Sequence, residues 1–167
     1  MTGQEINLQQ MLTRREQRVN EQNFFLKEYH SPLISFSMNI PGPIKTNEKI
    51  RKAFDSGRLE IFEALENLNA QINIFKEVHE VTGDELLISV KNLSAKTLKD
   101  MAIKIENDSK LGRLFDIDVI DSQGHKLSRK IFRKCLICDR QAQECARART
   151  HSIEEMQKAI EELIYNL

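Results

Sequence analysis

The stretch LISFSMNI, residues 33–40, alternates strictly between apolar and polar side chains. Its even-numbered positions are all apolar, whereas Ser35, Ser37 and Asn39 are polar. Successive side chains of a β-strand point to opposite faces, so this pattern predicts a half-buried strand. One face of the strand should pack on a core, and the other should present polar groups.

On either side of this strand, other segments show helical or strand patterns. Residues 5–29 carry apolar positions at helical spacing without Gly or Pro, and Arg15, Arg18 and Gln22 share one face of the predicted helix. Pro41-Gly42-Pro43 is a rigid turn after the strand. The remaining predicted elements are a helix at 47–69 broken at Gly57, strands at 72–80 and 85–91 joined as a hairpin, a helix from Ser94 to 107, a strand at 114–121, a weaker strand at 126–132 and a helical stretch at 141–150.

In order, residues 33–121 give β-α-β-β-α-β, which predicts an α+β fold with the split βαβ sheet of ferredoxin-like folds. Helices are added at both ends, and Ser152 with Glu155 forms a capping box for the C-terminal one. In this topology the last strand lies antiparallel beside the first, so residues 115–119 should approach residues 37–43. With 167 residues, 40% of them hydrophobic, we expect one domain spanning 1–167.

The overall composition excludes several kinds of partner. The chain has 25 basic and 25 acidic residues, so its net charge does not favour a nucleic acid or a membrane surface. The first ten residues lack the pattern of a secretory signal, and no window approaches the roughly 20 apolar residues of a membrane span. We therefore expect a cytoplasmic protein that binds neither membrane nor nucleic acid.

The segment LFDIDVID, residues 114–121, offers the clearest catalytic pattern. Asp116 and Asp118 lie two apart on a strand and point to the same face, while the intervening apolar residues point into the core. Two convergent carboxylates suit Mg²⁺, which prefers oxygen ligands and is often completed by substrate phosphates. An ordinary exposed strand face is the alternative, but Ser35, Ser37, Asn39 and His79 should add polar groups to this face.

Two further segments have features that favour phosphate binding. In the loop at 39–45, Gly42 permits close backbone approach and Lys45 supplies a cation, although a plain structural turn explains the loop equally well. Residues 126–149 are net positive by six, which suits a polyphosphate, an acidic protein or a solvated face. Phe132 is the only aromatic residue among them, so single-stranded nucleic acid ranks last.

All three cysteines fall in a short C-terminal stretch that ends at a histidine. Zn²⁺ can be held by such a Cys₃His set, comprising Cys135, Cys138, Cys145 and His151. The spacing is compact for a zinc knuckle, and buried thiols stacked on a helix at 141–150 are the favoured interpretation. A small zinc-bearing interaction module nevertheless remains a rival to an enzyme.

Four stretches together resemble the family of citrate lyase holo-acyl-carrier-protein synthases, and they span most of the chain: REQRVNEQ (15–22), LISFSMNIPGPIK (33–45), GRLFDIDV (112–119) and RKCLICDRQAQECARARTHS (133–152). The resemblance implies a nucleotidyltransferase-like transferase. Its donor would be 2'-(5''-triphosphoribosyl)-3'-dephospho-coenzyme A, its acceptor a serine of the apo-citrate lyase acyl-carrier subunit, and its leaving group diphosphate. The related synthase for the malonate decarboxylase carrier and a general nucleotidyltransferase acting on protein hydroxyls remain alternatives.

The resemblance also suggests roles for individual residues. Asp116 and Asp118 would bind the metal, and one of them or a bound hydroxide would take the serine proton. The other expected site residues are Arg113 in catalysis, Lys45 and Gly42 at the triphosphate, Arg147, Arg149 and His151 at the coenzyme or diphosphate, and Arg15, Arg18 and Arg129 elsewhere on the substrate. Outer basic residues such as Arg133 and Lys134 would meet an acidic carrier.

Overall fold

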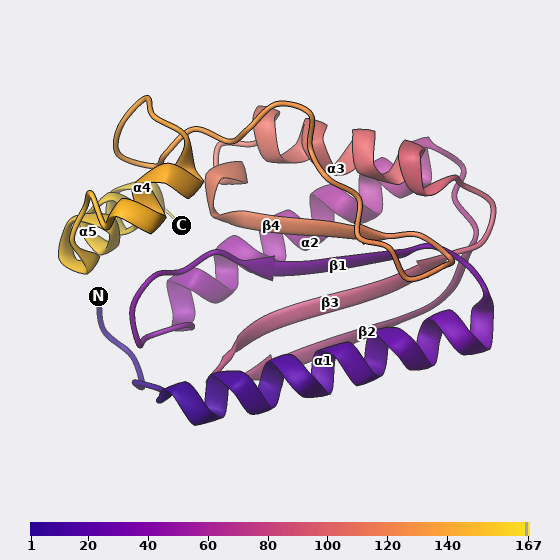
Figure 1. Ribbon diagram of the computed structural model, residues 1–167, viewed down its shortest axis with the longest axis horizontal. Helices are drawn as coiled ribbons and strands as arrows, with labels where there is room; N and C mark the ends of the chain where they lie inside the picture. The colour runs from indigo at the N-terminus through magenta and orange to yellow at the C-terminus, as the bar shows by residue number, and fades with distance from the viewer. Residues whose placement is uncertain (166) are drawn as a thin grey trace.

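The computed structural model describes residues 1–165 and 167. Within them the fold is α+β, with one antiparallel sheet in the order β2-β3-β1-β4 (Figure 1). The elements in chain order are α1 (Leu8–Tyr29), β1 (Leu33–Met38), α2 (Glu48–Asn67), β2 (Ile72–Glu80), β3 (Gly83–Val90), α3 (Ala95–Asp108), a 3-10 turn (Gly112–Leu114), β4 (Phe115–Ile120), α4 (Ala142–Ala148) and α5 (Ile153–Leu163).

The first and last strands are neighbours, as predicted. Met38 of β1 pairs with Phe115 of β4, and the Asn39 amide donates to the Leu114 carbonyl at 2.7 Å. The end of the first strand and its loop therefore lie beside the start of the aspartate strand. Residues almost 80 positions apart in the sequence share one edge of the molecule.

The two faces of the sheet are covered differently. α2 and α3 pack on one face, where Phe36, Phe54 and Phe115 form the fully buried aromatic centre of the core. α1 lies along the other face (Figure 1), and its Phe25 packs with Leu33 and Leu87. Because α1 covers part of this second face, β1 is more buried than the alternating pattern predicted.

Gly57 does not break the second helix, so that prediction was wrong. α2 runs unbroken from Glu48 to Asn67, and Gly57 is buried within it. A Cβ atom at Gly57 would lie 2.7 Å from the Phe36 ring and 2.8 Å from the Phe115 ring. The glycine therefore serves close helix-to-sheet packing and not a change of direction.

The weaker strand expected at 126–132 does not form. A turn at Asp121–Gly124 brings Lys126 opposite Ile120 in a single bridge, and the Leu127 amide donates to the Val119 carbonyl. Beyond this point the chain is held by arginine side chains, described below, and not by a backbone ladder. The first helix also starts later than predicted, at Leu8, where Asn7 forms a capping box with Gln10.

The C-terminal helices lie at the end of the sheet where β4 begins (Figure 1). The predicted capping box of Ser152 and Glu155 is present at the start of α5. Gly42, with φ of 85°, faces α5 so closely that a Cβ would lie 2.6 Å from Gln157. Among the described residues, no helix combines the length and apolar character needed to cross a membrane.

Candidate functional site

Two carboxylates project from β4 into a cleft on the face of the sheet opposite α2 and α3. Asp116 and Asp118 lie on one face of the strand, while Phe115, Ile117 and Val119 are buried on the other, as predicted. In the neighbouring strand, Ser37 is paired with Asp116 and Ser35 with Asp118, so these hydroxyls flank the carboxylates. The two carboxylates form part of the wall of a cavity of about 440 Å³, which we call the aspartate cavity.

The two carboxylates have different electrostatic surroundings. The Lys126 ammonium lies 2.5 Å from Asp118 Oδ2. Desolvation in the cleft, followed by the charge of Asp118, raises the pKa of Asp116, although Lys126, Arg133 and Arg18 act in the opposite direction. Asp116 therefore holds a proton more readily than an ordinary surface aspartate.

The first helix contributes polar groups to the same sheet face. Arg18 Nη1 lies 3.2 Å from Glu85 Oε1, and Gln22 Nε2 donates to Ser35 Oγ at 3.0 Å, so these two side chains of α1 point at the sheet. The sequence interpretation missed Arg14, which is buried and contacts Glu85 at 2.8 Å. Burial would lower the pKa of Arg14, but hydrogen bonds to Glu21 and Glu85 raise it overall.

A buried pair on α3 holds the free edge of β4 between the two aspartates. Glu106 accepts the Ile117 amide at 2.9 Å, and Lys99 Nζ donates to the Ile117 carbonyl at 3.3 Å. These side chains replace the hydrogen bonds that another strand would make. Burial raises the pKa of Glu106 and lowers that of Lys99, in each case as the leading cause. We call this pair the edge clamp.

Two arginines attach the C-terminal segment to the same edge. Arg133 donates to the carbonyls of Phe115 and Gly112, both at 2.7 Å, and lies 3.6 Å from Glu106. Arg129 donates to Asn107 at 2.8 Å and lies 3.7 Å from Glu106. Arg133 is thus an inner residue of the site and is not free to meet a carrier, contrary to the sequence expectation. Its carbonyl contacts also explain why 126–132 forms no strand.

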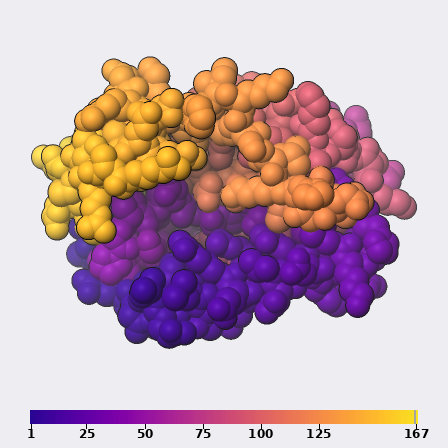
Figure 2. Space-filling view, viewed as in Figure 1, coloured from indigo at the N-terminus to yellow at the C-terminus, as the bar shows by residue number. Residues whose placement is uncertain are grey.

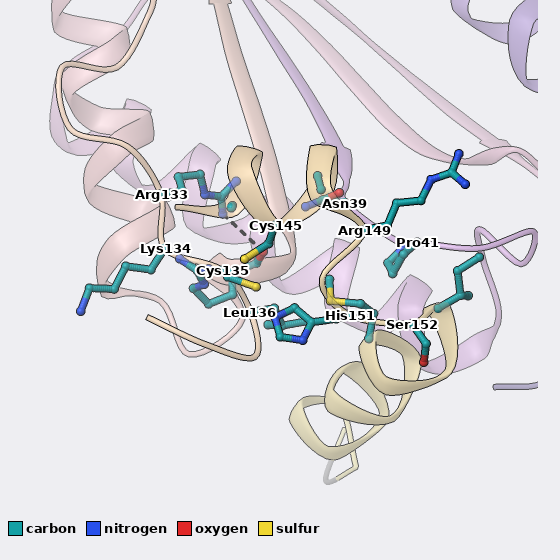
Figure 3. Close-up of a pocket in the computed structure, with 15 residues that line it drawn as sticks. Asn39, Pro41, Arg133, Lys134, Cys135, Leu136, Cys145, Arg149, His151 and Ser152 are labelled. Atoms are coloured by element: carbon teal, nitrogen blue, oxygen red, sulfur yellow. Dashed lines mark hydrogen bonds between the residues drawn. The ribbon is translucent and has the colours of Figure 1, made fainter. Parts of the chain in front are cut away.

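A second and larger cavity of about 700 Å³ adjoins the first, because Arg133 and Ala142 belong to the walls of both. We call it the C-terminal cavity. Arg113, Arg149 and Asn39 line it, so it contains three groups from widely separated parts of the sequence. Figure 3 labels Arg149 and Asn39. Burial, followed by the charge of Arg133, lowers the pKa of Arg113. Figure 2 shows the surface between α1 and the orange and yellow C-terminal segments, where the sheet face is hollowed.

The three cysteines and His151 come together beside the C-terminal cavity, and Cys135, Cys145 and His151 line it. We call this group the Cys₃His cluster, and it consists of Cys135, Cys138, Cys145 and His151. One ligand atom from each lies within 4.8 Å of every other. A backbone N–H at Arg140 and the His151 side chain lower the pKa of Cys138 to about 6, whereas burial raises that of Cys145 to about 11.

Several expected site residues lie outside these two cavities. The Lys45 ammonium donates to the Ile40 carbonyl at 2.7 Å, and burial, followed by the charge of Arg15, lowers its pKa. Gly42 faces α5, and Arg15 and Arg147 are exposed on their helices. His79 lies on the opposite face of the sheet, with Nδ1 2.8 Å from Asp84, and so does not join the aspartates.

Part of the edge clamp can be recognised from the sequence of α3. Lys99 and Glu106 are seven residues apart, so they share a helix face with Leu98, Met101 and Ile105. A cation and a carboxylate on an otherwise apolar helix face are rarely buried without partners. This signal points to a buried polar role, although it does not identify Ile117 as the partner.

Comparisons with known proteins agree with the resemblance carried by the motifs. A family model described as "Apo-citrate lyase phosphoribosyl-dephospho-CoA transferase" matches residues 6–167. A probable apo-citrate lyase phosphoribosyl-dephospho-CoA transferase of Vibrio cholerae serotype O1 (strain M66-2) is 38% identical over 165 residues, covering 96% of this chain and 93% of the relative. A protein of the same name from Streptococcus pyogenes serotype M5 (strain Manfredo) is 38% identical over 175 residues, covering 99% of this chain and 88% of the relative. The chain therefore belongs to the apo-citrate lyase phosphoribosyl-dephospho-CoA transferases, a family of transferases.

Proposed function

We propose that the chain transfers the phosphoribosyl-dephospho-CoA group from triphosphoribosyl-dephospho-CoA to a serine hydroxyl of the apo-citrate lyase acyl-carrier subunit. Diphosphate is the other product. Family membership supports the group transferred, and the observation that supports the site is the meeting of two cavities at Arg133, beside Asp116. One cavity is large enough for part of the coenzyme, and the other carries the carboxylates.

The bond changes define what the site has to do. The serine oxygen forms a bond to the α-phosphorus of the triphosphate, the bond from that phosphorus to the bridging oxygen breaks, and the serine proton leaves. Such transfers depend chiefly on positioning and on neutralising negative charge. Arg113, Arg149 and Arg129 supply positive charge. Among the described residues, Arg129 Nε is buried without a hydrogen-bond partner, so this guanidinium keeps an unused donor beside the cavity.

Asp116 is the proposed base for the serine proton. Its raised pKa makes it a stronger base than an ordinary aspartate. Asp118 is a poorer candidate because its carboxylate already contacts Lys126. The proton would pass from the serine oxygen to an Asp116 oxygen and then to solvent.

The carboxylate face fits the Mg²⁺ ion that the resemblance implies. Asp116 and Asp118 are hard oxygen donors on one strand face, and the open cavity leaves room for phosphate oxygens. Lys126 has to leave Asp118 when a metal binds there, so the lysine competes with the ion. When bound, the ion would neutralise charge on the triphosphate.

The fold proposal follows from topology. The order β2-β3-β1-β4, with α2 and α3 as the two connecting helices, supports a ferredoxin-like sheet with a nucleotidyltransferase-like site on its open face. The N- and C-terminal helices are then additions that border this face. A cytoplasmic location fits three free cysteines that lie close together.

The test is to incubate the purified chain with triphosphoribosyl-dephospho-CoA and the apo-carrier, and to measure the intact mass of the carrier. We expect the mass of the phosphoribosyl-dephospho-CoA group to appear on the carrier serine and to be absent from a Ser→Ala carrier. An apo-carrier of malonate decarboxylase and an unrelated serine-rich protein serve as controls. Equal transfer to all three proteins, or none to the citrate lyase carrier, would contradict the proposal.

A further inference from the structure

We propose that the Cys₃His cluster binds one structural Zn²⁺ ion, which holds residues 134–152 in place and thereby fixes one wall of the C-terminal cavity. The proposal concerns metal binding and is independent of the transfer reaction. It also replaces the sequence expectation of buried thiols beside a polar histidine.

The first argument is the geometry of the donors. Cys138 Sγ lies 3.5 Å from Cys145 Sγ, and His151 Nε2 lies 3.3 Å from Cys138 Sγ. A tetrahedral zinc ion with Zn–S near 2.3 Å and Zn–N near 2.0 Å separates its ligand atoms by about 3.5–3.8 Å. All four donors lie within 4.8 Å of one another, so small side-chain movements bring them to these separations.

The second argument is how the backbone brings the donors together. The Cys135 amide donates to the Arg140 carbonyl at 2.7 Å and the Ala142 amide to the Arg133 carbonyl at 2.8 Å, so the C-x-x-C pair lies within a narrow hairpin-like loop. Cys145 follows in the first turns of α4. Arg149 then adopts a left-handed conformation with φ of 48°, and the Thr150 amide donates back to the Cys145 carbonyl. This turn places His151 against the thiols.

The third argument is how little of this part of the chain is buried: apart from the thiols, Leu136 packs against the main core and is only partly buried. Among the described residues 134–152, only Cys135 and Cys145 are buried, and α4 has seven residues. Burial of two thiols gives little hydrophobic stabilisation, and segments with so small a core commonly depend on a metal or a disulfide. A disulfide would use two of the thiols and leave the third and the imidazole without a role. A zinc ion uses all four donors.

The chemistry of the donors favours zinc and a structural role. Thiolates and an imidazole are the ligands of structural Zn²⁺ sites, which have four protein ligands and no open position for a substrate. Three thiolates around Zn²⁺ leave a net charge of about −1, which the surrounding basic segment balances. His151 is then a metal ligand and not a substrate-binding residue.

The assignment links the metal to the shape of the site. Cys135, Cys145 and His151 line the same cavity as Arg113 and Arg149, and Figure 3 shows the sulfurs and the imidazole gathered on one side of it. Arg149 lies two residues before His151 in the sequence. The zinc ion would therefore limit the movement of the arginine proposed to meet the coenzyme.

The experiment measures zinc in the full chain purified under reducing conditions. We expect one zinc ion per chain to remain after dialysis against a weak chelator. Cys145→Ser and His151→Ala should lower the apparent Zn²⁺ affinity by at least about 100-fold, because loss of an outer-shell partner alone costs up to that much. His151→Cys, which restores four donors, should keep the ion. His125→Ala, outside the cluster, is the matched control and should keep it too.

Two spectroscopic measurements complete the test. Co²⁺ in place of zinc should give the intense visible bands of a tetrahedral thiolate site, and removal of zinc should reduce amide protection in 134–152 while the sheet stays protected. A wild-type chain that neither retains nor takes up zinc, equal zinc affinity in Cys145→Ser, or a metal-free Cys138–Cys145 disulfide would each overturn the proposal.

Discussion

Asp116 is subject to opposing electrostatic influences that can be changed one at a time. Desolvation and the charge of Asp118 raise its pKa, whereas Lys126 lowers it. If Asp116 is the base, the acidic limb of the pH profile of kcat/KM reports its pKa in the free enzyme. A shift of this limb when a charged neighbour of Asp116 is replaced therefore tests whether Asp116 is the base.

Substitutions on either side of Asp116 should move that limb in opposite directions. Lys126→Met removes a positive neighbour, so the pKa of Asp116 rises and activity is lost at a higher pH than in wild type. Asp118→Asn removes a negative neighbour, so the pKa falls and the residual activity extends to lower pH. The measurement is the pH dependence of kcat/KM, with exposed Lys27→Met as the control. If the acidic limb stays at the same pH, or moves in the direction opposite to the one expected, another group takes the proton.

The edge clamp gives a prediction about stability. Glu106→Ala leaves the buried Ile117 amide without its acceptor and Arg129 and Arg133 without their carboxylate, so unfolding free energy should fall by about 1–3 kcal/mol or more. Glu106→Gln keeps an acceptor and should lose less. Urea unfolding of both, with exposed Glu63→Ala as the control, checks this. Equal stability of wild type and Glu106→Ala would show that β4 does not need the clamp.

Among the helices and strands, the packing of α2 on the sheet depends on Gly57. Gly57→Ala should raise helix propensity by up to about 1 kcal/mol, but the new Cβ meets two buried phenylalanine rings that have little room to move. We expect a net loss of about 1–3 kcal/mol in unfolding free energy. Asp55→Ala, exposed on the same helix, is the control. A stabilised Gly57→Ala variant would mean that the rings shift without cost.

The strands with clear alternation were predicted closely, and the segments held by side chains were not. LISFSMNI and LFDIDVID form β1 and β4, because alternation is a local property that the sheet preserves. KLSRKIF has a weaker pattern, and its path depends on Arg129 and Arg133 reaching Glu106 on a distant helix. The role of Gly57 likewise depends on rings from two strands. Local sequence patterns do not predict such long-range contacts.

The basic segment should dock the carrier through its exposed lysines. Lys130→Glu combined with Lys134→Glu should raise the KM for the carrier and weaken its salt dependence, with little change in kcat, because both side chains are exposed at the rim. The control is Lys27→Glu combined with Lys91→Glu, which changes the net charge by the same amount on α1 and after β3, outside the basic segment. Initial rates over a range of carrier and salt concentrations check this. A lowered kcat with unchanged KM would show that these lysines act in the chemical step and not in docking the carrier.

At the scale of the whole molecule, the site forms where three distant parts of the chain meet. β1 carries the serines, β4 carries the aspartates, and the C-terminal segment adds the arginines and the Cys₃His cluster. The topology predicted from the strand order placed the first two together. The position of the C-terminal segment was not predictable, because the arginine contacts and the cysteine cluster that determine it have no periodic pattern.

The central claim is that the Asp116–Asp118 face is where transfer occurs. The most direct measurement is diphosphate release by Asp116→Asn, Asp118→Asn and Asp121→Asn at matched thermal stability, across a Mg²⁺ titration. Asp121 accepts the amides of Gln123 and His125 in a turn, and Asn can accept both, so this control should keep near-normal activity. The first two variants should stay folded and lose about 10²-fold or more in rate. Near-normal rates for both, or a loss confined to Asp121→Asn, would contradict the claim.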